Sequence, residues 1–363
     1  MTDGIPAVRL DNRDAWNALL PRLQDLVLSG RFTLGIELEE FEEAATRAFG
    51  SMWCVGTSSG TSALLLVLRA ALAPGSRVAL PANTFFATLE AVVAAGHRPV
   101  IVDNDPDYVI DLDLLAEIEV DAVIPVHLYG LPADMDRLNS LAKDRGWFVL
   151  EDASQAHGAS VSRKKVGALG DAAAFSAYPT KNLGAWGDAG FVTGRDPDLE
   201  ERVRSLRHHG QSTPDVHHSI GGTERMDNLQ ALVLTEKLNH LDEEVERRRQ
   251  VAGWYRSALA DTGLDLPGDR GERRHVFHQF VIRVPDRDRV RAALKGRGIE
   301  TSVHYPTPVH LQPGAVGQCE VPKPPRRAEA WAGELLSLPF FPSLSENQVD
   351  TVAEALRVIL RST

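Results

Sequence analysis

The pattern of apolar and polar positions changes along the chain. Residues 13–29 and 36–49 carry apolar side chains at helical spacing, so both segments are predicted helices. From Trp53 onward, short apolar runs alternate with helix-like segments. Each run is bounded by turn-forming residues, which is typical of a buried strand. The predicted strands are 77–81, 99–103, 122–127, 148–152, 172–176 and 191–194, and the helices between them include 61–73, 88–95 and 132–145.

Strands that alternate with helices predict an α/β fold built on a parallel sheet. The helices cover both faces of such a sheet, which explains why its strands read as continuous apolar runs. Ligands of these folds bind at the carboxyl ends of the strands. Candidate functional residues are therefore expected directly after the strands.

The last third of the chain shows a different pattern. Two long charged segments predict helices, and a stretch rich in turn formers separates them from a shorter run of strands and helices. We predict a smaller α+β unit here, so that the N-terminal helices and the large unit occupy residues 1–245 and the small unit 246–363. The elements predicted are helices 231–241 and 243–259, a loop 264–275, a strand 276–284, a helix 287–297, a strand 300–304 and two further helices.

Composition narrows the classes of function. The 363 residues carry a formal net charge of -11, and an acidic chain repels nucleic acid and anionic membranes, so neither partner is expected. The apolar run 63–68 ends at Arg69, far short of the roughly twenty apolar residues of a membrane span. Cys54 and Cys319 cannot cross-link so long a chain, and the polar N-terminus does not resemble a signal peptide. We expect a cytoplasmic protein with reduced thiols.

Two turns after predicted strands carry candidate binding residues. In VGTSSGTSALL, small residues let the backbone approach a ligand, and the helix beginning near Thr61 offers N–H groups that suit a phosphate. The alternative is an ordinary helix cap by Ser59 or Thr61. The segment is neither a Walker A loop nor G-x-G-x-x-G, which argues against nucleoside triphosphatases and dinucleotide enzymes. In PANTFFATLEAV, Phe85 and Phe86 can stack on a flat heterocycle or pack in the core.

Two further strand ends carry ionisable side chains. Glu151 and Asp152 end a very apolar strand, where a carboxylate needs a partner such as a protonated pyridine nitrogen. A helix cap or a bond to a backbone amide is the alternative. Lys181 follows a strand and a Tyr-Pro turn in a stretch with no other basic residue. Desolvation there would lower its pKa and free the amine for imine formation, whereas a solvated loop lysine is the alternative.

In chain order, a phosphate-type turn, an aromatic, a strand-end Asp and a strand-end Lys are the parts that a pyridoxal 5'-phosphate (PLP) site requires. Matching motifs run over nearly the whole chain, and SAYPTKNLGAWGDAG is very specific. Through them the sequence resembles the DegT/StrS sugar aminotransferases, within the fold type I PLP enzymes. The resemblance implies a mostly parallel seven-stranded sheet between helices and a smaller C-terminal α+β domain. The other motifs are GTSSGT, PANTFFAT, PVHLYGLPADMD, EDASQAHGA, RMDNLQA, HVFHQFVIRVP, HYPTPVHLQP and LSLPFFPSLSENQV.

The resemblance also implies roles for individual residues. Lys181 would carry PLP as a Schiff base and move the proton during transamination, and Asp152 would pair with the protonated pyridine nitrogen. His304 and Tyr305 lie in the segment that borders the sugar site in this family. No metal is implied. The remaining cofactor contacts implied are Gln155 at the ring hydroxyl, Phe85 on the ring face, and Gly60, Thr61 and Ser176 at the phosphate.

One position departs from the family pattern. The family usually reads G-x-N-x-R-M/L before its LQA helix, and that Asn reaches the phosphate of the partner subunit in a dimer with shared active sites. This chain reads IGGTERMDNLQA, so Thr223 stands in that place, and Asn228 is not obviously its replacement. Thr has a hydroxyl donor but a shorter reach, so Thr223 is a candidate cofactor contact and the contact across the dimer is left open. We expect a homodimer.

The expected activity is transfer of an amino group to a nucleotide-linked keto-deoxysugar, in amino-sugar or antibiotic biosynthesis, with L-glutamate as the donor that the resemblance suggests. Family members with His in place of the lysine are dehydratases, and this chain keeps Lys181. A keto-cyclitol acceptor and a non-catalytic regulator with a PLP fold are the alternatives. A metalloenzyme is a third, since His208, His209, His217 and His218 share one segment, although adjacent pairs lack the i, i+4 spacing of a helical zinc site.

Overall fold

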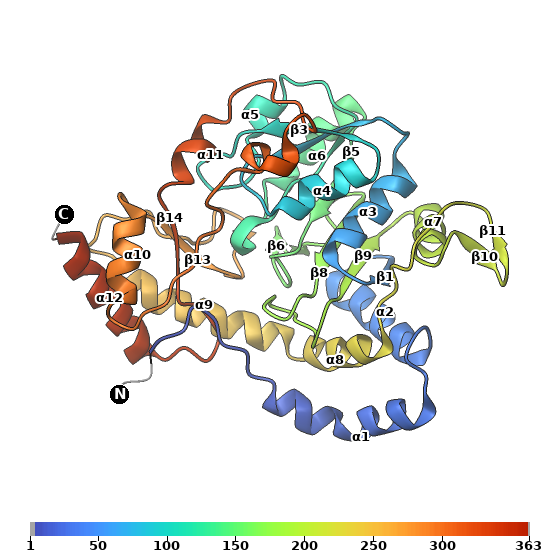
Figure 1. The fold of residues 1–363 in the computed structure, drawn as a ribbon, viewed down its shortest axis with the longest axis horizontal. Coiled ribbons are helices and arrows are strands. Elements are labelled where there is room, and N and C mark those ends of the chain that lie inside the picture. The colour runs from blue at the N-terminus through green and yellow to red at the C-terminus, as the bar shows by residue number, and fades with distance from the viewer. Residues whose placement is uncertain (1–3, 362–363) are drawn as a thin grey trace.

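The computed structural model describes residues 4–361, arranged as a large unit and a smaller C-terminal unit (Figure 1). The outermost residues of the two predicted units, 1–3 and 362–363, lie outside the described part. Between residues 4 and 361, no helix is long and apolar enough to cross a membrane.

A seven-stranded sheet forms the centre of the large unit, in the order β1-β9-β8-β5-β4-β2-β3 (Figure 1). From β8 to β3 the neighbouring strands are parallel, whereas β9 runs antiparallel to both β8 and β1. This confirms the predicted α/β fold with a mostly parallel sheet. The strands are β1 (Trp53–Thr57), β2 (Arg77–Pro81), β3 (Arg98–Val102), β4 (Ala122–Val123), β5 (Phe148–Asp152), β8 (Ala172–Ser176) and β9 (Gly190–Gly194).

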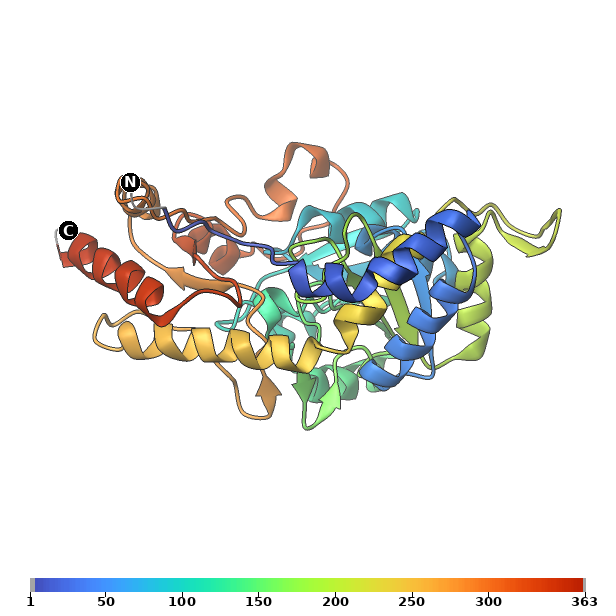
Figure 2. The ribbon, with the colours of Figure 1, turned by 90° about the horizontal axis from the view of Figure 1, so that it is seen from below.

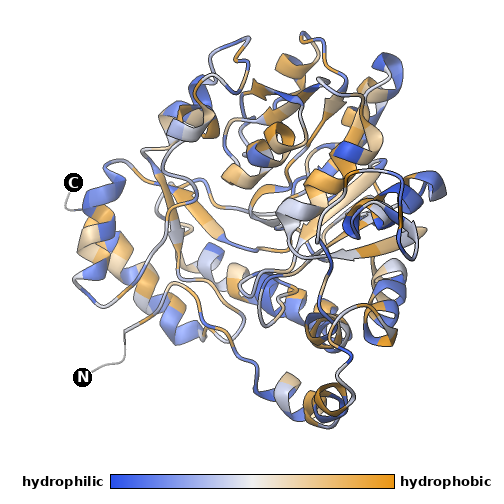
Figure 3. Ribbon diagram, turned by 45° about the vertical axis from the view of Figure 1, so that its right-hand side comes forward, coloured by the Kyte–Doolittle hydropathy of each residue, from blue (hydrophilic) through white to orange (hydrophobic). Residues whose placement is uncertain are grey.

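Helices pack on both faces of this sheet, with polar residues turned outward and apolar residues inward (Figure 3). The helix α1 lies along the outside of α8 (Figure 1). The helices of the large unit are α1 (Arg13–Ser29), α2 (Ile36–Phe49), α3 (Gly60–Ala71), α4 (Phe86–Ala94), α5 (Leu112–Leu115), η1 (Leu128–Gly130), α6 (Met135–Arg145), α7 (Pro197–Arg207) and α8 (Asn228–Leu238).

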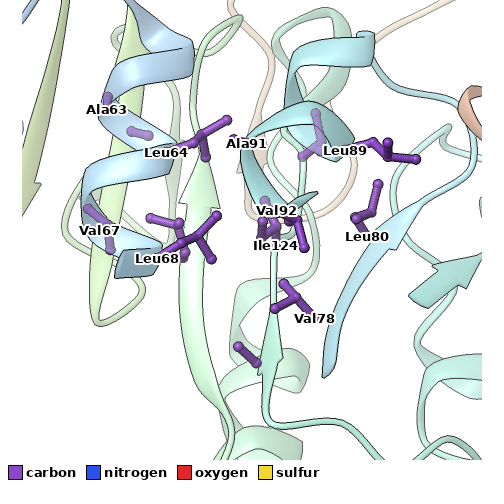
Figure 4. Close-up of a cluster of buried hydrophobic side chains, with 14 of the residues drawn as sticks. Ala63, Leu64, Val67, Leu68, Val78, Leu80, Leu89, Ala91, Val92 and Ile124 are labelled. Carbon is purple, nitrogen blue, oxygen red and sulfur yellow. The ribbon is translucent and has the colours of Figure 1, made fainter. Parts of the chain in front are cut away.

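The two faces are both apolar because successive side chains of a strand point to opposite sides of the sheet. On one face, Leu68 of α3 and Leu89 of α4 pack in a cluster with Val78 of β2 (Figure 4). On the other face, the rings of Phe41 in α2 and Phe191 in β9 lie with their centroids 5.5 Å apart. The sheet is thus held rigidly, and the ends of its strands offer fixed positions for a site.

The small unit is built on a two-stranded antiparallel sheet of β13 and β14. Here one prediction was wrong and one strand was missed. Residues 300–304 form no regular strand, because only Ser302 makes a bridge, to Ser337 of β14. The strand β14 itself was not predicted. The elements of this unit are β13 (Phe280–Arg283), α10 (Arg287–Lys295), β14 (Leu335–Leu338) and α12 (Glu346–Arg361). Between α10 and β14, the chain returns to the large unit, where η2 (Val309–Leu311), η3 (Pro313–Ala315) and α11 (Arg326–Trp331) pack in its apolar cluster.

The long helix α9 (Leu241–Ala258) joins the two units (Figure 2). Val245 packs in the apolar cluster of α2, whereas Val251 packs in that of the small unit, so we retain the division after residue 245 as a proposal. Ile5 also packs in the small unit's cluster, where it pairs with Ile299. The N-terminal segment therefore crosses from the small unit to the large one.

Candidate active site

The structure brings the predicted strand-end residues to one edge of the sheet. Asp152 ends β5 and Ser176 ends β8, and these strands are parallel neighbours. Gly60 opens α3 against the same edge, where an added Cβ would lie 2.6 Å from the Ser176 Cβ. Only glycine permits that approach, so Gly60 fixes the start of α3 beside the ends of β5 and β8.

The turn between β1 and α3 contains an ordinary helix cap, and it also leaves backbone N–H groups in the first turn of α3 without helical partners. The Ser59 hydroxyl accepts from the Ser62 N–H at 3.0 Å, which is the ordinary cap that the sequence allowed. Thr61 is partly buried in the first turn of α3, where backbone N–H groups lack helical partners. The Glu224 carboxylate accepts from the Ser58 hydroxyl at 2.9 Å and from the Ser62 hydroxyl, which fixes the turn from its outer side.

Lys181 lies in the loop between β8 and β9, where its N–H donates to the Tyr178 carbonyl at 2.8 Å. The side chain is partly buried. Burial lowers the pKa of Lys181 to about 8, and the Asp152 carboxylate opposes that shift. A cavity of about 720 Å³, bordered by both units, adjoins the loop. The amine is therefore neutral to a far greater extent near pH 7 than an ordinary lysine, as imine chemistry requires.

Asp152 is held in place by its neighbours. The side chain is 5% exposed, and the Thr88 hydroxyl donates to its Oδ2 at 2.8 Å. The Ser154 N–H donates to Oδ1 at 3.2 Å. The carboxylate is also near enough to Lys181 to act on that amine's pKa.

The adjacent acid, Glu151, points to the other face of the sheet and has a structural environment. The carboxylate is fully buried and lies 3.0 Å from the His127 Nε2. It also accepts from the N–H groups of Gly167, Leu169 and Gly170 at 3.2, 2.9 and 2.9 Å. The alternative considered for these two acids was a bond to backbone amides. It accounts for Glu151, and Asp152 also accepts one such bond, from Ser154.

Glu151→Gln is expected to destabilise the protein by about 1–3 kcal/mol, because an amide cannot accept from all of these donors and buries an N–H group among them. The free energy of unfolding, from urea titration followed by circular dichroism, measures the loss. Glu354→Gln, at an exposed position of α12, is the matched control. Equal stability of the two variants would contradict this role.

Gln155, Phe85 and Tyr305 form one connected group. The Tyr129 N–H donates to Gln155 Oε1 at 2.7 Å, so the amide nitrogen is turned outward and donates to the Tyr305 hydroxyl at 3.1 Å. The rings of Tyr305 and Phe85 lie with their centroids 5.7 Å apart. Phe85 is 57% exposed, so it is available for stacking and is not a core residue.

His304 reaches the site from the small unit. Its Nδ1 lies 2.8 Å from the Ser337 hydroxyl of β14, and its carbonyl accepts from the Tyr129 hydroxyl. Burial, followed by the charge of Lys181, lowers the pKa of His304 to about 4. The structure thus places His304 beside Tyr129, and Tyr305 beside Gln155 and Phe85.

Thr223 lies apart from this group. It is exposed, and its hydroxyl is 3.2 Å from His209 Nε2. The preceding hairpin of β10 (Gln211–Thr213) and β11 (Val216–His217) projects from the body (Figures 1 and 2). The neighbouring Glu224 carbonyl accepts from the Ser58 N–H at 2.9 Å, so the segment runs along the turn that opens α3.

The four histidines of the metal alternative lie on this hairpin and directly on either side of it. His208 Nδ1 is 3.1 Å from Arg225 Nη1, and His217 Nδ1 is 2.9 Å from the His209 carbonyl. In the part of the chain that the structure describes, no three His, Cys, Asp or Glu side chains gather as metal ligands. These contacts give His208, His209 and His217 structural partners.

Two buried polar residues near the loop of Lys181, Asn182 and His278, were not singled out from the sequence. Both are buried, and His278 Nδ1 lies 3.3 Å from Asn182 Oδ1. The motifs KNLGAWG and HVFHQF contain them, but nothing in either motif indicates that they meet. Their contact arises only because the segment after β12 (Arg273–Arg274) docks on η1, where the His278 N–H donates to the Tyr129 carbonyl at 2.9 Å.

A loop lysine and a buried strand-end acid near the carboxyl edge of a mostly parallel sheet, in a large unit joined to a smaller one, form the architecture of a fold type I aminotransferase. The sequence profile of the DegT/DnrJ/EryC1/StrS aminotransferase family matches residues 15–357. The chain belongs to this family, whose aminotransferases depend on PLP.

The chain is similar over nearly its whole length to proteins of known name. It is 42% identical to the dTDP-3-amino-3,4,6-trideoxy-alpha-D-glucose transaminase of Streptomyces venezuelae, covering 94% of this chain and 91% of that protein. It is 40% identical to a pleiotropic regulatory protein of Geobacillus stearothermophilus, covering 97% and 98%. Among solved structures, S. venezuelae DesV in complex with a ketimine intermediate matches with a TM-score of 0.92 at 40% identity, covering 98% of each chain.

Proposed function

We propose that this aminotransferase moves the amino group of L-glutamate to a nucleotide-linked keto-deoxysugar, in amino-sugar or antibiotic biosynthesis. The observation that carries the proposal is the loop lysine Lys181, whose lowered pKa responds to the buried strand-end acid Asp152, in a chain similar to a dTDP-sugar transaminase. We further propose that the enzyme is cytoplasmic.

The residues at the sheet edge fit PLP. The close approach of Gly60 to Ser176 and the open start of α3 make a cradle for a phosphate, to which Thr61 adds a hydroxyl. The outward amide of Gln155 suits the ring hydroxyl, and Phe85 suits the ring face. Lys181 would hold the cofactor covalently.

When bound, PLP supplies an electron sink for the pair released at the donor's α-carbon. Lys181 Nζ takes the proton from that carbon, and an amine with a pKa of about 8 serves this exchange near neutral pH. Asp152, held by Thr88, keeps a proton on the ring nitrogen. In the second half of the reaction, Lys181 Nζ would return a proton to the acceptor's carbon, where the nitrogen given up by glutamate replaces the ketone oxygen and that oxygen leaves as water.

His304 and Tyr305 are proposed to contact the acceptor sugar. His304 is neutral near pH 7, since its pKa is lowered to about 4, and it therefore adds no positive charge next to Lys181. Both residues come from the small unit and contact the large one through Tyr129 and Gln155. This position lets them border both the cofactor and a bound sugar.

We propose that the active form is a homodimer. Exposed apolar side chains support a second copy: Phe85 and Tyr178 beside the site are 57% and 51% exposed, and Trp16 of α1 is 50% exposed. The hairpin that precedes Thr223 projects from the body (Figure 2), where it is able to reach another chain. We propose Thr223, which follows this hairpin, as a candidate cofactor contact.

A second candidate is a regulatory protein that has kept the fold. The similarity to a pleiotropic regulatory protein favours it, whereas the intact set of Lys181, Asp152 and Gln155 favours an enzyme. A visible absorbance band of the PLP-loaded protein that changes when L-glutamate is added separates the two, because a protein without transamination chemistry leaves the band unchanged.

The acceptor is tested by incubating the pure protein with PLP, L-glutamate and a panel of dTDP- and UDP-linked keto-deoxysugars and keto-cyclitols. We expect an aminated nucleotide sugar and an equal amount of 2-oxoglutarate, identified by mass spectrometry, and neither product from Lys181→Ala. Amination of the cyclitols alone would move the assignment to the alternative acceptor, and amination of no ketone would remove the proposed activity.

A further inference from the structure

Asp152 receives one of its hydrogen bonds through a pair of buried hydroxyls. The Thr88 hydroxyl donates to Asp152 Oδ2 at 2.8 Å, and the Thr84 hydroxyl oxygen lies 3.0 Å from that of Thr88. The residues Thr84, Thr88 and Asp152 are 2%, 1% and 5% exposed. Because all three are shielded from bulk water, these bonds are stronger than they would be at the surface.

The direction of donation along this hydroxyl pair follows from the number of protons. A hydroxyl carries a single proton, and an ionised carboxylate only accepts. The proton of Thr88 therefore goes to Asp152, and Thr88 Oγ1 accepts from the Thr84 hydroxyl. Donation runs from Thr84 through Thr88 to the carboxylate, and polarisation along such a chain strengthens its last bond.

The other oxygen of the carboxylate is held as well. The Ser154 N–H donates to Asp152 Oδ1 at 3.2 Å, so each oxygen has a donor from a different segment. The two donors fix the plane of the carboxylate. They also leave lone pairs on both oxygens for a further N–H group, since a carboxylate offers about four acceptor positions.

The hydroxyl pair comes from the same turn as Phe85. Thr84 and Thr88 stand on either side of Phe85 and Phe86, between the end of β2 and the first turn of α4. In the sheet, β4 separates β2 from β5, so the Thr88 side chain spans this gap to reach Asp152. One turn therefore carries both the aromatic that suits the ring face and the hydroxyls that hold the acid.

We infer that Thr84 and Thr88 are positioning residues whose hydroxyls form a relay to Asp152 and keep its carboxylate charged and oriented toward the ring nitrogen of bound PLP. The inference rests on the proposed pairing of Asp152 with that nitrogen. Donors to a carboxylate favour its charged form, which is the form that keeps a proton on the ring. A carboxylate already held in place also needs no reorientation when charge moves into the ring.

The ring nitrogen gives the first readout. The full-length protein is loaded with PLP isotopically labelled at this nitrogen, and its resonance is recorded by solid-state nuclear magnetic resonance. The wild type is expected to show the resonance of a protonated pyridine. Thr88→Val keeps nearly the same shape without the hydroxyl, so it is expected to move the resonance toward that of an unprotonated ring, because the carboxylate has lost a donor.

The half-reaction with L-glutamate gives the second readout. In single turnovers followed by cofactor absorbance, Thr88→Val is expected to react about tenfold more slowly at saturating L-glutamate, the size of one lost hydrogen bond to a charged group. Thr84→Val removes only the outer hydroxyl, and a loss of about twofold is expected. Thr88→Ser keeps the donor and should return both readouts toward those of the wild type.

Thr193→Val is the matched control. Thr193 is also fully buried, and its hydroxyl donates to the Gly167 carbonyl at 2.7 Å. It pairs with Ala173 near the start of β8, away from the carboxyl edge of the sheet. This variant should leave the resonance and the rate per folded protein unchanged. A wild-type resonance in Thr88→Val, or an equal change in Thr193→Val, overturns the inference.

Two comparisons keep the result interpretable. If Thr88→Val does not fold, Thr84→Val carries the test, and an unchanged rate together with an unchanged resonance in that variant refutes the relay. Failure of the proposed function is seen in the wild type. An unprotonated ring nitrogen there would refute the pairing with Asp152, whereas a protonated nitrogen that does not respond to Thr88 would refute the role of the hydroxyl pair alone.

Discussion

Lys181→Ala is expected to lower transamination by about 10⁴-fold or more, to below detection, because the variant lacks both the covalent hold on PLP and the base that moves the proton. The visible absorbance of the loaded protein is expected to be lost or shifted. An assay that couples 2-oxoglutarate formation to glutamate dehydrogenase measures the rate.

Two controls separate this effect from a general loss of structure. Lys295→Ala removes an exposed lysine of α10 and is expected to keep the wild-type rate. Lys181→Arg keeps a cation in the loop but offers no amine that forms an imine, so it is expected to be inactive as well. A Lys181→Ala enzyme that turns over at near the wild-type rate would refute the assignment of this residue.

Asp152→Asn is expected to lower the rate by about 10²- to 10³-fold while PLP stays bound. A neutral amide cannot offset the positive charge of a protonated ring nitrogen, so the ring becomes a weaker electron sink, whereas the phosphate cradle at Gly60, Thr61 and Ser176 is untouched. Steady-state kinetics give the rate, and fluorescence titration gives the affinity for PLP.

The control for this variant lies at the opposite end of the neighbouring strand. Asp171 precedes β8 and accepts from the Val149 N–H at 2.8 Å, far from the carboxyl edge that holds the site. Asp171→Asn is therefore expected to leave the rate per folded protein unchanged. A wild-type rate in Asp152→Asn, with PLP bound, would exclude the pyridine pairing.

Much of the fold was predictable because the large unit follows simple rules. Three of the strands, β2, β5 and β8, have the predicted bounds, since each is a short apolar run between turn formers and is buried on both faces. The helices α1 and α2 also match, since both carry apolar residues at helical spacing. Most of those in α2 face the core, whereas α1 buries only Leu19 and Leu26 and leaves Trp16 half exposed. The strand predicted at 122–127 is shorter, and β4 ends at Val123, although Val126 still bridges to Asp152.

The small unit was harder to predict from the sequence because its strand pairings join segments that are distant along the chain. A strand was predicted at 300–304, but the adjacent β14 pairs along its other edge with β13, and only Ser302 joins it on this side. The run LLSL of β14 is four residues long and is followed by Pro339, a length at which an apolar run does not reveal its structure. The strand predicted at 276–284 begins only at Phe280, since residues 276–279 dock on η1 instead.

For the site, the order of motifs predicted which side chains meet at the sheet edge, because parallel strands bring their carboxyl ends together. The sequence carries no comparable rule for contacts made across the two units. The bond between Asn182 and His278 is such a contact, and so is that between Gln155 and Tyr305. Thr223, which departs from the family pattern, lies beside His209 and is still a candidate cofactor contact.

The central claim is tested most directly by reducing the PLP-loaded protein with sodium borohydride, digesting it and sequencing the modified peptide by mass spectrometry. A pyridoxyl group on the lysine of SAYPTKNLGAWGDAG is the expected result. A pyridoxyl group on another lysine, with the Lys181 peptide unmodified, would contradict the account.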